Sequence, residues 1–267
     1  MKILFIGDIV AKPGRQAVKA ALPGILAEEK PDLVIANAEN LAHGRGATAG
    51  TIQEMMDVGV DFFTGGDHLF WHKDFEKEIA DLPVIRPANY PENVPGRGWA
   101  VLDTTPEKVL VVNMMGQTFI EEPISNPFSK IDEILSDSST KDVSVKVIDF
   151  HGEATSDKLA FGFYLDGKVD AVIGTHTHIP TCDERVLPNG TMFVSDIGMT
   201  GNIDSVLGVK KEIIIDRMAN AKKQKFEWEE VGRQEFRSVL INTETKEIRR
   251  VDKKLYRQAE LKGGVKK

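Results

Sequence analysis

Six short apolar runs along the chain have the length and the β-branched content of buried strands. Each run ends abruptly in polar residues or glycine, which is typical of strands that are covered on both faces. The runs occupy residues 3–6, 33–36, 62–64, 109–112, 145–148 and 171–173. This pattern predicts a sheet core whose strands are buried on both sides.

Stretches with a helical spacing of apolar residues lie between these runs. They occupy residues 18–26, 52–56, 75–82, 128–135 and 155–165. Pro23 predicts a kink or a break in the first stretch, because proline cannot donate a helical hydrogen bond. Asn126 followed by Pro127 supplies a capping residue and a proline at the first helical position, so we expect a helix to begin there. The alternation of strands and helices predicts an α/β layered fold.

The chain changes character after residue 225. Apolar and polar positions alternate from Phe226 to Val251, and residues 242–245 interrupt them as a turn would. This pattern predicts an antiparallel pair of strands with one solvent-facing side. We expect this pair, within residues 226–256, to close a sheet edge inside a single domain of residues 1–267.

The overall charge excludes a protein whose whole surface gathers polyanions. The 267 residues include 34 Lys and Arg against 41 Asp and Glu, a net charge of −7, and 41% of them are hydrophobic, as in globular proteins. Residues 249–267 are the exception, with eight basic and two acidic residues. The basic tail, residues 257–267, is either a contact arm for RNA or an acidic partner, or a solvated chain end.

Two features of the chain indicate its compartment. The single Cys182 cannot form an internal disulfide, which favours a reducing compartment. The apolar run after Met1 is far shorter than that of a signal peptide, and no segment has the ~20 apolar residues that span a bilayer. We therefore expect a cytoplasmic protein with no membrane partner.

Polar side chains of the types that bind metals follow five of the apolar runs. They are Asp8, Glu39, Asn40, Asp67, His68, His151, His176 and His178. Because the carboxyl ends of parallel strands meet at one edge of a sheet, we expect these side chains to lie close together. Carboxylate oxygens and imidazole nitrogens are the ligands that Mn, Fe or Zn require. The sequence therefore predicts a metal site at this edge.

Each of these groups alone also has an ordinary structural interpretation. Asp8 could cap the helix that follows it, residues 39–40 could form a turn, and histidines also settle in polar interiors by hydrogen bonding. His176 and His178 would lie on the same face of an extended segment, a spacing that suits chelation. The recurrence of such groups at strand ends, most of them beside a glycine, favours the metal site.

These residues resemble the calcineurin-like metallophosphoesterases, and most closely the bacterial YmdB-type subfamily. The resemblance rests on Gly7-Asp8, Ala38-Glu39-Asn40, Gly66-Asp67-His68, Phe150-His151 and Gly174-Thr175-His176-Thr177-His178, and on residues 6–10, 37–46, 86–91, 151–156 and 195–201. It extends from the first strand to residue 215. It implies a four-layer α/β/β/α sandwich with mixed sheets and two bound metal ions, Fe or Mn, with Zn as a further option.

The resemblance also assigns roles by motif position. One metal would bind Asp8, Asn40 and His178, the other Asp67, His151 and His176, with Glu39 bridging them and His68 beside them. Val10 stands where the wider superfamily has a histidine, an absence that the YmdB-type members share. Asp67 replaces the usual asparagine, and its added negative charge should weaken the metals' Lewis acidity or favour a more oxidised iron.

The activity implied by the resemblance is hydrolysis of small phosphodiesters, cyclic nucleotides among them, either cAMP or 2′,3′-cyclic nucleotides. We expect a hydroxide held between two metal ions to attack the phosphorus, with His68 as the general acid for the departing alkoxide. His43 and Arg45 lie in a glycine-rich loop shortly after Glu39 and are candidate contacts for a phosphate oxygen. Arg86 is a weaker candidate.

Two other classes of function were compared with this one. A dinucleotide-binding oxidoreductase needs G-x-G-x-x-G, but Gly7 and Gly14 are too far apart and residues 44–50 miss the spacing by one residue. A metal-binding regulatory protein that captures RNA or a protein partner with little turnover stays open, with Asp67 and the basic tail as its supporting features. The sequence also leaves a homo-oligomer open.

Overall fold

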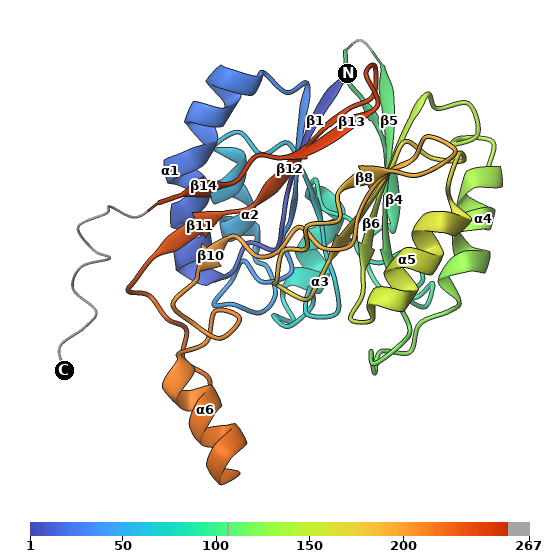
Figure 1. Cartoon of the computed structure of the whole chain (residues 1–267). Coiled ribbons are helices and arrows are strands. Elements are labelled where there is room, and N and C mark those ends of the chain that lie inside the picture. Colours follow the sequence, from blue (N-terminus) through green and yellow to red (C-terminus); the bar gives the residue numbers. More distant parts are fainter. Residues whose placement is uncertain (106, 256–267) are drawn as a thin grey trace.

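Two β-sheets pack face to face between two layers of helices in the computed structural model, which describes residues 1–105 and 107–255 (Figure 1). The first sheet has the strand order β13-β12-β1-β2-β3. Its strands are β1 (Lys2–Ile6), β2 (Leu33–Asn37), β3 (Phe62–Thr64), β12 (Ser238–Asn242) and β13 (Glu247–Arg250). β1, β2 and β3 run parallel, whereas β12 pairs antiparallel with both β1 and β13.

The second sheet has the strand order β4-β5-β6-β7-β9-β8. Its strands are β4 (Trp99–Asp103), β5 (Lys108–Met115), β6 (Val145–His151), β7 (Ala171–Thr175), β8 (Arg185–Val186) and β9 (Met192–Val194). The four central strands are parallel, and β4 and β8 are antiparallel edge strands. Both sheets are therefore mixed, as expected.

Helices cover the outer face of each sheet. Those over the first sheet are α1 (Ala11–Glu29), α2 (Ala49–Met56) and α3 (Phe75–Glu78), the last continuing into a 3₁₀ turn (Ile79–Asp81). Those over the second sheet are α4 (Pro127–Ser136) and α5 (Thr155–Tyr164). The resulting order of layers confirms the predicted α/β/β/α sandwich.

The alternation of side chains along β1 shows why the apolar runs are continuous. Ile3 and Phe5 pack into the core between the two sheets, whereas Leu4 and Ile6 pack against the helices. All four side chains are buried because each face of the sheet is covered. The same reasoning holds for the other predicted runs, and all six are strands in the structure.

Two expectations about helices have different outcomes. Asn126 caps α4 as predicted, since its side-chain oxygen accepts hydrogen bonds from the amides of Phe128 at 2.9 Å and Ser129 at 3.3 Å. The break expected at Pro23 is absent, and α1 is continuous from Ala11 to Glu29. Pro23 lies on the exposed side of α1, where water can bind the carbonyl group that the missing amide leaves free.

The strand pair near the carboxyl end is shorter than residues 226–256 and differs in its exposure. β12 and β13 are joined by a turn at residues 243–246 and form one edge of the first sheet. The expectation of a solvent-facing side is wrong for β12, because Leu240 packs under the helices while Val239 and Ile241 face the second sheet. Residues 226–228 lie outside this pair.

Three short strands form a small separate sheet beside α1. They are β10 (Gly201–Asn202), β11 (Gln234–Phe236) and β14 (Lys253–Lys254). Between β10 and β11 the chain forms α6 (Lys211–Asn220), which projects away from the sandwich (Figure 1). None of the residues of α6 is buried, so this helix contributes little to the core.

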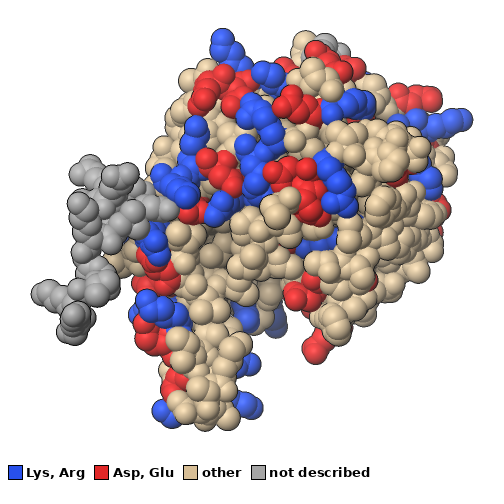
Figure 2. Space-filling view, in the orientation of Figure 1, with Lys and Arg blue, Asp and Glu red and all other residues tan. Residues whose placement is uncertain are grey.

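The charges of the described surface are mixed. Figure 2 shows basic and acidic side chains interspersed over one face rather than gathered by sign. Within the basic segment, Arg249, Arg250 and Lys253 form ion pairs with Glu29, Asp252 and Glu28. The basic tail at residues 257–267 lies outside the described residues. Among those described, no helix combines the length and the apolar composition needed to cross a bilayer.

Candidate metal centre

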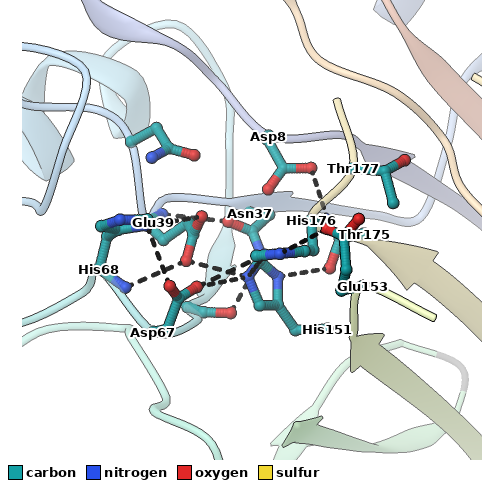
Figure 3. A network of polar contacts seen from close by, with 12 residues as sticks. Asp8, Asn37, Glu39, Asp67, His68, His151, Glu153, Thr175, His176 and Thr177 are labelled. Atoms are coloured by element: carbon teal, nitrogen blue, oxygen red, sulfur yellow. Dashed lines mark hydrogen bonds and ion pairs between the residues drawn. The ribbon is translucent and has the colours of Figure 1, made fainter. Parts of the chain in front are cut away.

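The parallel strands of both sheets end at one rim of the sandwich, and the predicted polar residues lie together there (Figure 3). Asp8 follows β1, and residues 39–40 follow β2. Residues 67–68 follow β3, His151 ends β6, and residues 176–178 follow β7. Residues 8–68 come from the first sheet and residues 151–178 from the second, so contacts between these two sets exist only because the sheets pack face to face.

The first cluster consists of Glu39, Asp67, His151 and His176, whose ligand atoms lie within 4.8 Å of one another. His151 Nε2 is 3.0 Å from Glu39 Oε2 and 3.1 Å from Asp67 Oδ1. The same nitrogen is 3.0 Å from His176 Nδ1. Two carboxylates and two imidazoles therefore converge on a volume that one cation could occupy.

The second cluster consists of Asp8, Glu39 and His178, within the same 4.8 Å limit. Asn40 adjoins it, with its side-chain oxygen 3.1 Å from His178 Nε2. The Asn40 amide nitrogen donates to the carbonyl oxygen of Gly44 at 3.1 Å, which orients the oxygen toward His178. Glu39 belongs to both clusters, so the two candidate metal positions are adjacent and share one carboxylate.

His68 lies beside the clusters and belongs to neither of them. Its Nδ1 is 3.4 Å from Asp67 Oδ2 and 3.6 Å from Glu39 Oε1. Its backbone amide donates to Glu39 Oε2 at 3.3 Å. Its ring is 27% exposed and lines the pocket above the clusters. His68 can therefore reach a molecule in the pocket without being a metal ligand.

The protonation behaviour of the buried groups differs between the two clusters. Burial raises the pKa of Asp8 to about 7 and lowers the pKa of His178 to about 4. Burial opposes the charge on Glu39 as well, but the nearby His151 outweighs it and holds the pKa of Glu39 at about 2. His151, although buried, has its pKa raised well above the ordinary value by Glu39 and Asp67.

The second cluster fits a divalent cation. Asp8 Oδ1 and His178 Nδ1 are buried and have no hydrogen-bond partner among the described residues. A cation would supply the positive charge that a buried Asp8 carboxylate lacks, and the low pKa of His178 keeps its imidazole neutral, as a metal ligand must be. Oxygen and nitrogen donors together suit Mn, Fe or Zn.

Gly66 allows the backbone after β3 to approach the first cluster closely. A Cβ atom at this position would lie 2.0 Å from Glu39 Oε2 and 2.4 Å from His151 Nε2. Any other residue would therefore displace two of the candidate ligands. This clash explains why a glycine precedes Asp67, a feature that the sequence pattern only suggested.

The segment after β7 is not extended, which corrects one prediction. His176 and His178 have φ angles of 99° and 65°, in the left-handed region that residues other than glycine rarely adopt. The chain turns between them, so His176 joins the first cluster and His178 the second. They are not a chelating pair on one face, and such backbone strain is typical of functional sites.

A buried ion pair that the sequence did not reveal supports this segment. Lys158 Nζ lies 2.6 Å from Asp196 Oδ2, and both side chains are 1% exposed. Lys158 also donates to the carbonyl oxygen of Thr175 at 2.8 Å. The same Asp196 oxygen accepts from the Thr177 backbone at 3.0 Å and from its hydroxyl at 2.8 Å. The pair therefore fixes the backbone on both sides of His176.

We expect Lys158→Met to destabilise the fold strongly, because it leaves the Asp196 carboxylate buried without a charged partner. The free energy of unfolding should fall by about 3–5 kcal/mol, as measured by urea denaturation. Lys168→Met is the matched control, since Lys168 pairs with Asp132 at 3.9 Å with both side chains about half exposed. Equal stabilities of the two variants would contradict the role given to this pair.

Asp149 is a second buried group that pattern analysis missed. It lies inside β6 and accepts a 2.7 Å hydrogen bond from the Thr175 hydroxyl, which is 2.9 Å from His151 Nδ1. It also accepts a hydrogen bond from the side chain of Asn37, on β2 of the opposite sheet, at 3.1 Å. Such contacts orient a ligating imidazole and join the two sheets beneath the site.

The candidate phosphate contacts differ in their positions. A pocket of about 340 Å³ above the clusters is lined by Glu39, Asn40, His68, His176 and His178, and Arg45 forms part of its wall. His43 does not line this pocket and instead lines an adjoining hollow. Arg86 is buried and donates to the carbonyl oxygens of Pro87 and Val94, so its role is structural.

A comparison with known families shows which family the chain belongs to. The family model described as YmdB-like protein matches residues 4–254. The chain belongs to the YmdB-like family. This result confirms the subfamily that the motifs from Asp8 to His178 indicated, and the match also covers the carboxyl-terminal strands beyond residue 215, to which the resemblance did not extend.

Three relatives of this YmdB-like chain illustrate the similarity. A curated Bacillus subtilis (strain 168) protein named 2′,3′-cyclic-nucleotide 2′-phosphodiesterase is 44% identical over 218 residues, 81% of this chain and 82% of the relative. A Thermus thermophilus crystal structure described as a hypothetical protein has a TM-score of 0.89 at 36% identity, covering 95% of this chain and 99% of that one. A Mycoplasma pneumoniae structure described as a novel phosphatase has a TM-score of 0.88 at 30% identity, covering 98% and 96%. The expected enzyme class, a phosphoesterase, is thereby confirmed.

Proposed function

We propose that this YmdB-like protein is a dinuclear metal-dependent phosphodiesterase that hydrolyses 2′,3′-cyclic nucleotides. The observation that carries the proposal is the pair of ligand clusters that share Glu39, with His68 beside them at the floor of a pocket. The name of the Bacillus subtilis relative supports this substrate class over cAMP. The proposal includes opening of the cyclic ester at the 2′ oxygen.

The two clusters support the proposed ligand sets. One ion would be held by Asp67, His151 and His176, the other by Asp8, Asn40 and His178, with Glu39 between them. When bound, two cations of this kind activate water for attack and neutralise the charge that develops on the phosphoryl oxygens. Fe or Mn, with Zn as a further option, matches these donors.

The protein's own part in the reaction is to position the ligands and to move a proton. His68 would donate that proton to the departing 2′ oxygen, because an alkoxide is a poor leaving group unless it is protonated. Burial lowers the pKa of His68, but Glu39 and Asp67 outweigh burial and raise it above the ordinary value. In the metal-free protein these two carboxylates therefore favour the protonated form of His68.

Asp67 adds a negative charge to the proposed metal site. Hydrogen bonds from His151 and His176 outweigh its burial and hold its pKa well below the ordinary value, so it contributes a full negative charge. Three carboxylates, Asp8, Glu39 and Asp67, then face a nominal charge of +4 on two divalent ions. This balance supports weaker Lewis acidity of the metals, or a more oxidised iron, than an asparagine at position 67 would give.

The direct test combines metal analysis with hydrolysis. Protein purified without added metal salts should contain up to two transition-metal ions per chain, measured by mass spectrometry. The same preparation, supplied with Mn²⁺, should open adenosine 2′,3′-cyclic phosphate to the 3′-phosphate and hydrolyse bis(p-nitrophenyl) phosphate. Two bound ions without hydrolysis under any metal supplied would favour the metal-binding regulator instead, and absence of metal binding would overturn both functions.

A further inference from the structure

A second hollow adjoins the pocket above the metal clusters. Its volume is about 700 Å³, and it shares Arg45, Phe226 and Trp228 with the smaller pocket. On its other side it is lined by Trp71, Arg217 and Lys225. We call this hollow the basic-aromatic groove. The shared residues border both hollows, so the two lie side by side, and a molecule that extends past these residues would contact both.

Three cations give the basic-aromatic groove its charge. Arg45, Arg217 and Lys225 line it. Among the described residues, no carboxylate lines it and none forms an ion pair with these three. The chain as a whole carries a net charge of −7, and many of its basic side chains are paired with acidic ones. A cluster of cations that form no ion pair with the described residues therefore favours an anionic ligand beside the site.

Aromatic faces alternate with these cations. The Arg45 guanidinium lies 4.8 Å from the centre of the Trp71 ring and 5.4 Å from that of Phe226, and the Arg217 guanidinium lies 5.3 Å from the same Phe226 ring. Trp71 is 59% exposed, so most of its large apolar surface is not used in the core. Aromatic rings alternating with cations are the lining on which unpaired nucleobases stack.

The groove lies next to His68. The ring centre of Trp71 is 6.2 Å from that of His68, and Trp71 in turn contacts Arg45, which lines both hollows. The far wall comes from Arg217 on α6 and from the segment after it, residues 224–228. α6 buries none of its own residues, and Arg217 on this helix contributes to the wall.

We propose that the basic-aromatic groove binds the nucleotides on the 5′ side of the cyclic phosphate in a single-stranded oligoribonucleotide. This inference rests on the proposed function. A 2′,3′-cyclic phosphate can only terminate the 3′ end of an RNA chain, so any further nucleotides extend from the 5′ oxygen of the terminal residue. With the cyclic ester at the clusters, the preceding phosphate would face Arg217 and Lys225, and its base would stack on Trp71 or Phe226.

The preferred substrate is then an RNA fragment rather than a mononucleotide. A mononucleotide fills only the pocket of about 340 Å³ and makes no use of Arg217 or Lys225. Arginine and lysine pair strongly with phosphate, and stacking adds to that pairing, so each added nucleotide gains binding energy. Such binding is sensitive to salt because counterions are released from the RNA.

The test compares a mononucleotide substrate with a trinucleotide substrate, using the metal-loaded protein. The value of kcat/KM is measured for adenosine 2′,3′-cyclic phosphate and for a trinucleotide that ends in the same cyclic phosphate. Wild-type protein should prefer the trinucleotide by about 10-fold or more. The double variant Arg217→Ala/Lys225→Ala should lose that preference while its kcat/KM for the mononucleotide changes by less than about 2-fold.

The double variant Lys222→Ala/Lys223→Ala is the matched control. It removes the same charge from the same segment, but neither residue lines the groove. It should keep the preference for the trinucleotide. Equal kcat/KM values for both substrates in wild-type protein, or equal losses of the preference in the two double variants, would overturn the proposal.

A binding measurement separates this inference from the proposed function. A 5′-fluorescein trinucleotide with a 3′-phosphate end should bind wild-type protein at least about 10-fold more tightly than Arg217→Ala/Lys225→Ala, as measured by anisotropy. This difference without hydrolysis of any cyclic ester would contradict the proposed function and support the groove. Hydrolysis of the mononucleotide, with equal affinities of the two proteins for the trinucleotide, would support the proposed function and contradict the groove. Displacement of the trinucleotide by polyglutamate as readily as by polyuridylate would overturn RNA as the ligand.

Discussion

Glu39→Gln should empty both metal positions and lower the turnover of cyclic nucleotides by about 10⁴-fold or more, because water activation and charge stabilisation are lost together. Glu39 is the only described residue that belongs to both ligand clusters. With a pKa held at about 2, its side chain is negative at every working pH, and the substitution removes that charge while keeping nearly the same size and shape. Metal content by mass spectrometry and the rate of hydrolysis are the two measurements.

The fold should survive this substitution. Glu39 is 1% exposed and lies near two other carboxylates, Asp8 and Asp67, so in metal-free protein the substitution removes a buried charge. The control is Glu54→Gln, at the contact between α1 and α2, where Glu54 pairs with Arg15 and Lys19. Glu54→Gln should retain both ions and full turnover. A Glu39→Gln protein that binds two ions per chain would show that Glu39 is not the shared ligand.

His68→Ala should lower the turnover of a 2′,3′-cyclic nucleotide by about 10²- to 10⁴-fold, the usual contribution of a general acid. Its metal content should not change, because His68 is not in either cluster. Hydrolysis of bis(p-nitrophenyl) phosphate should fall much less, because p-nitrophenolate leaves without being protonated. The ratio of the two rates therefore isolates proton donation from metal binding and from positioning.

The pH profile gives an independent measurement on the same variant. Glu39 and Asp67, acting against burial, raise the pKa of His68, so the acid is present below that pKa and is lost as the pH rises through it. Wild-type activity on the cyclic nucleotide should fall on the alkaline side, and His68→Ala should lack that decline. Loss of metal from His68→Ala, or equal losses on both substrates, would refute proton donation by His68.

Local patterns were sufficient to predict the strands and most of the site. A strand covered on both faces must be apolar at every position, so the runs at residues 33–36 and 171–173 could be recognised alone. The polar residues directly after such runs could be predicted to lie together, because parallel strands end at one edge of a sheet. The helix that begins after Asn126 was predictable for a similarly local reason, since its cap needs only adjacent residues.

Other features could not be predicted from local patterns. Asp149 lies within a strand pattern, and Lys158 and Asp196 resemble ordinary surface charges in the sequence, yet all three are buried beneath the site. Alternation of apolar residues placed Phe226 and Trp228 in the expected strand pair, whereas the structure places them over the pocket. Their positions depend on the path of the chain after α6, which no short-range periodicity encodes.

The sequence by itself determined which residues are buried in strands, which polar groups stand at the strand ends, and the family to which they point. Only the tertiary structure decided that Glu39 is shared between two clusters, that His176 and His178 separate, and that a basic-aromatic groove joins the site. The physical reason is the range of the interactions. The sequence patterns that indicate a buried strand or a helix cap span only a few residues. The hydrogen bond between Asn37 and Asp149 exists only when two complete sheets have packed together.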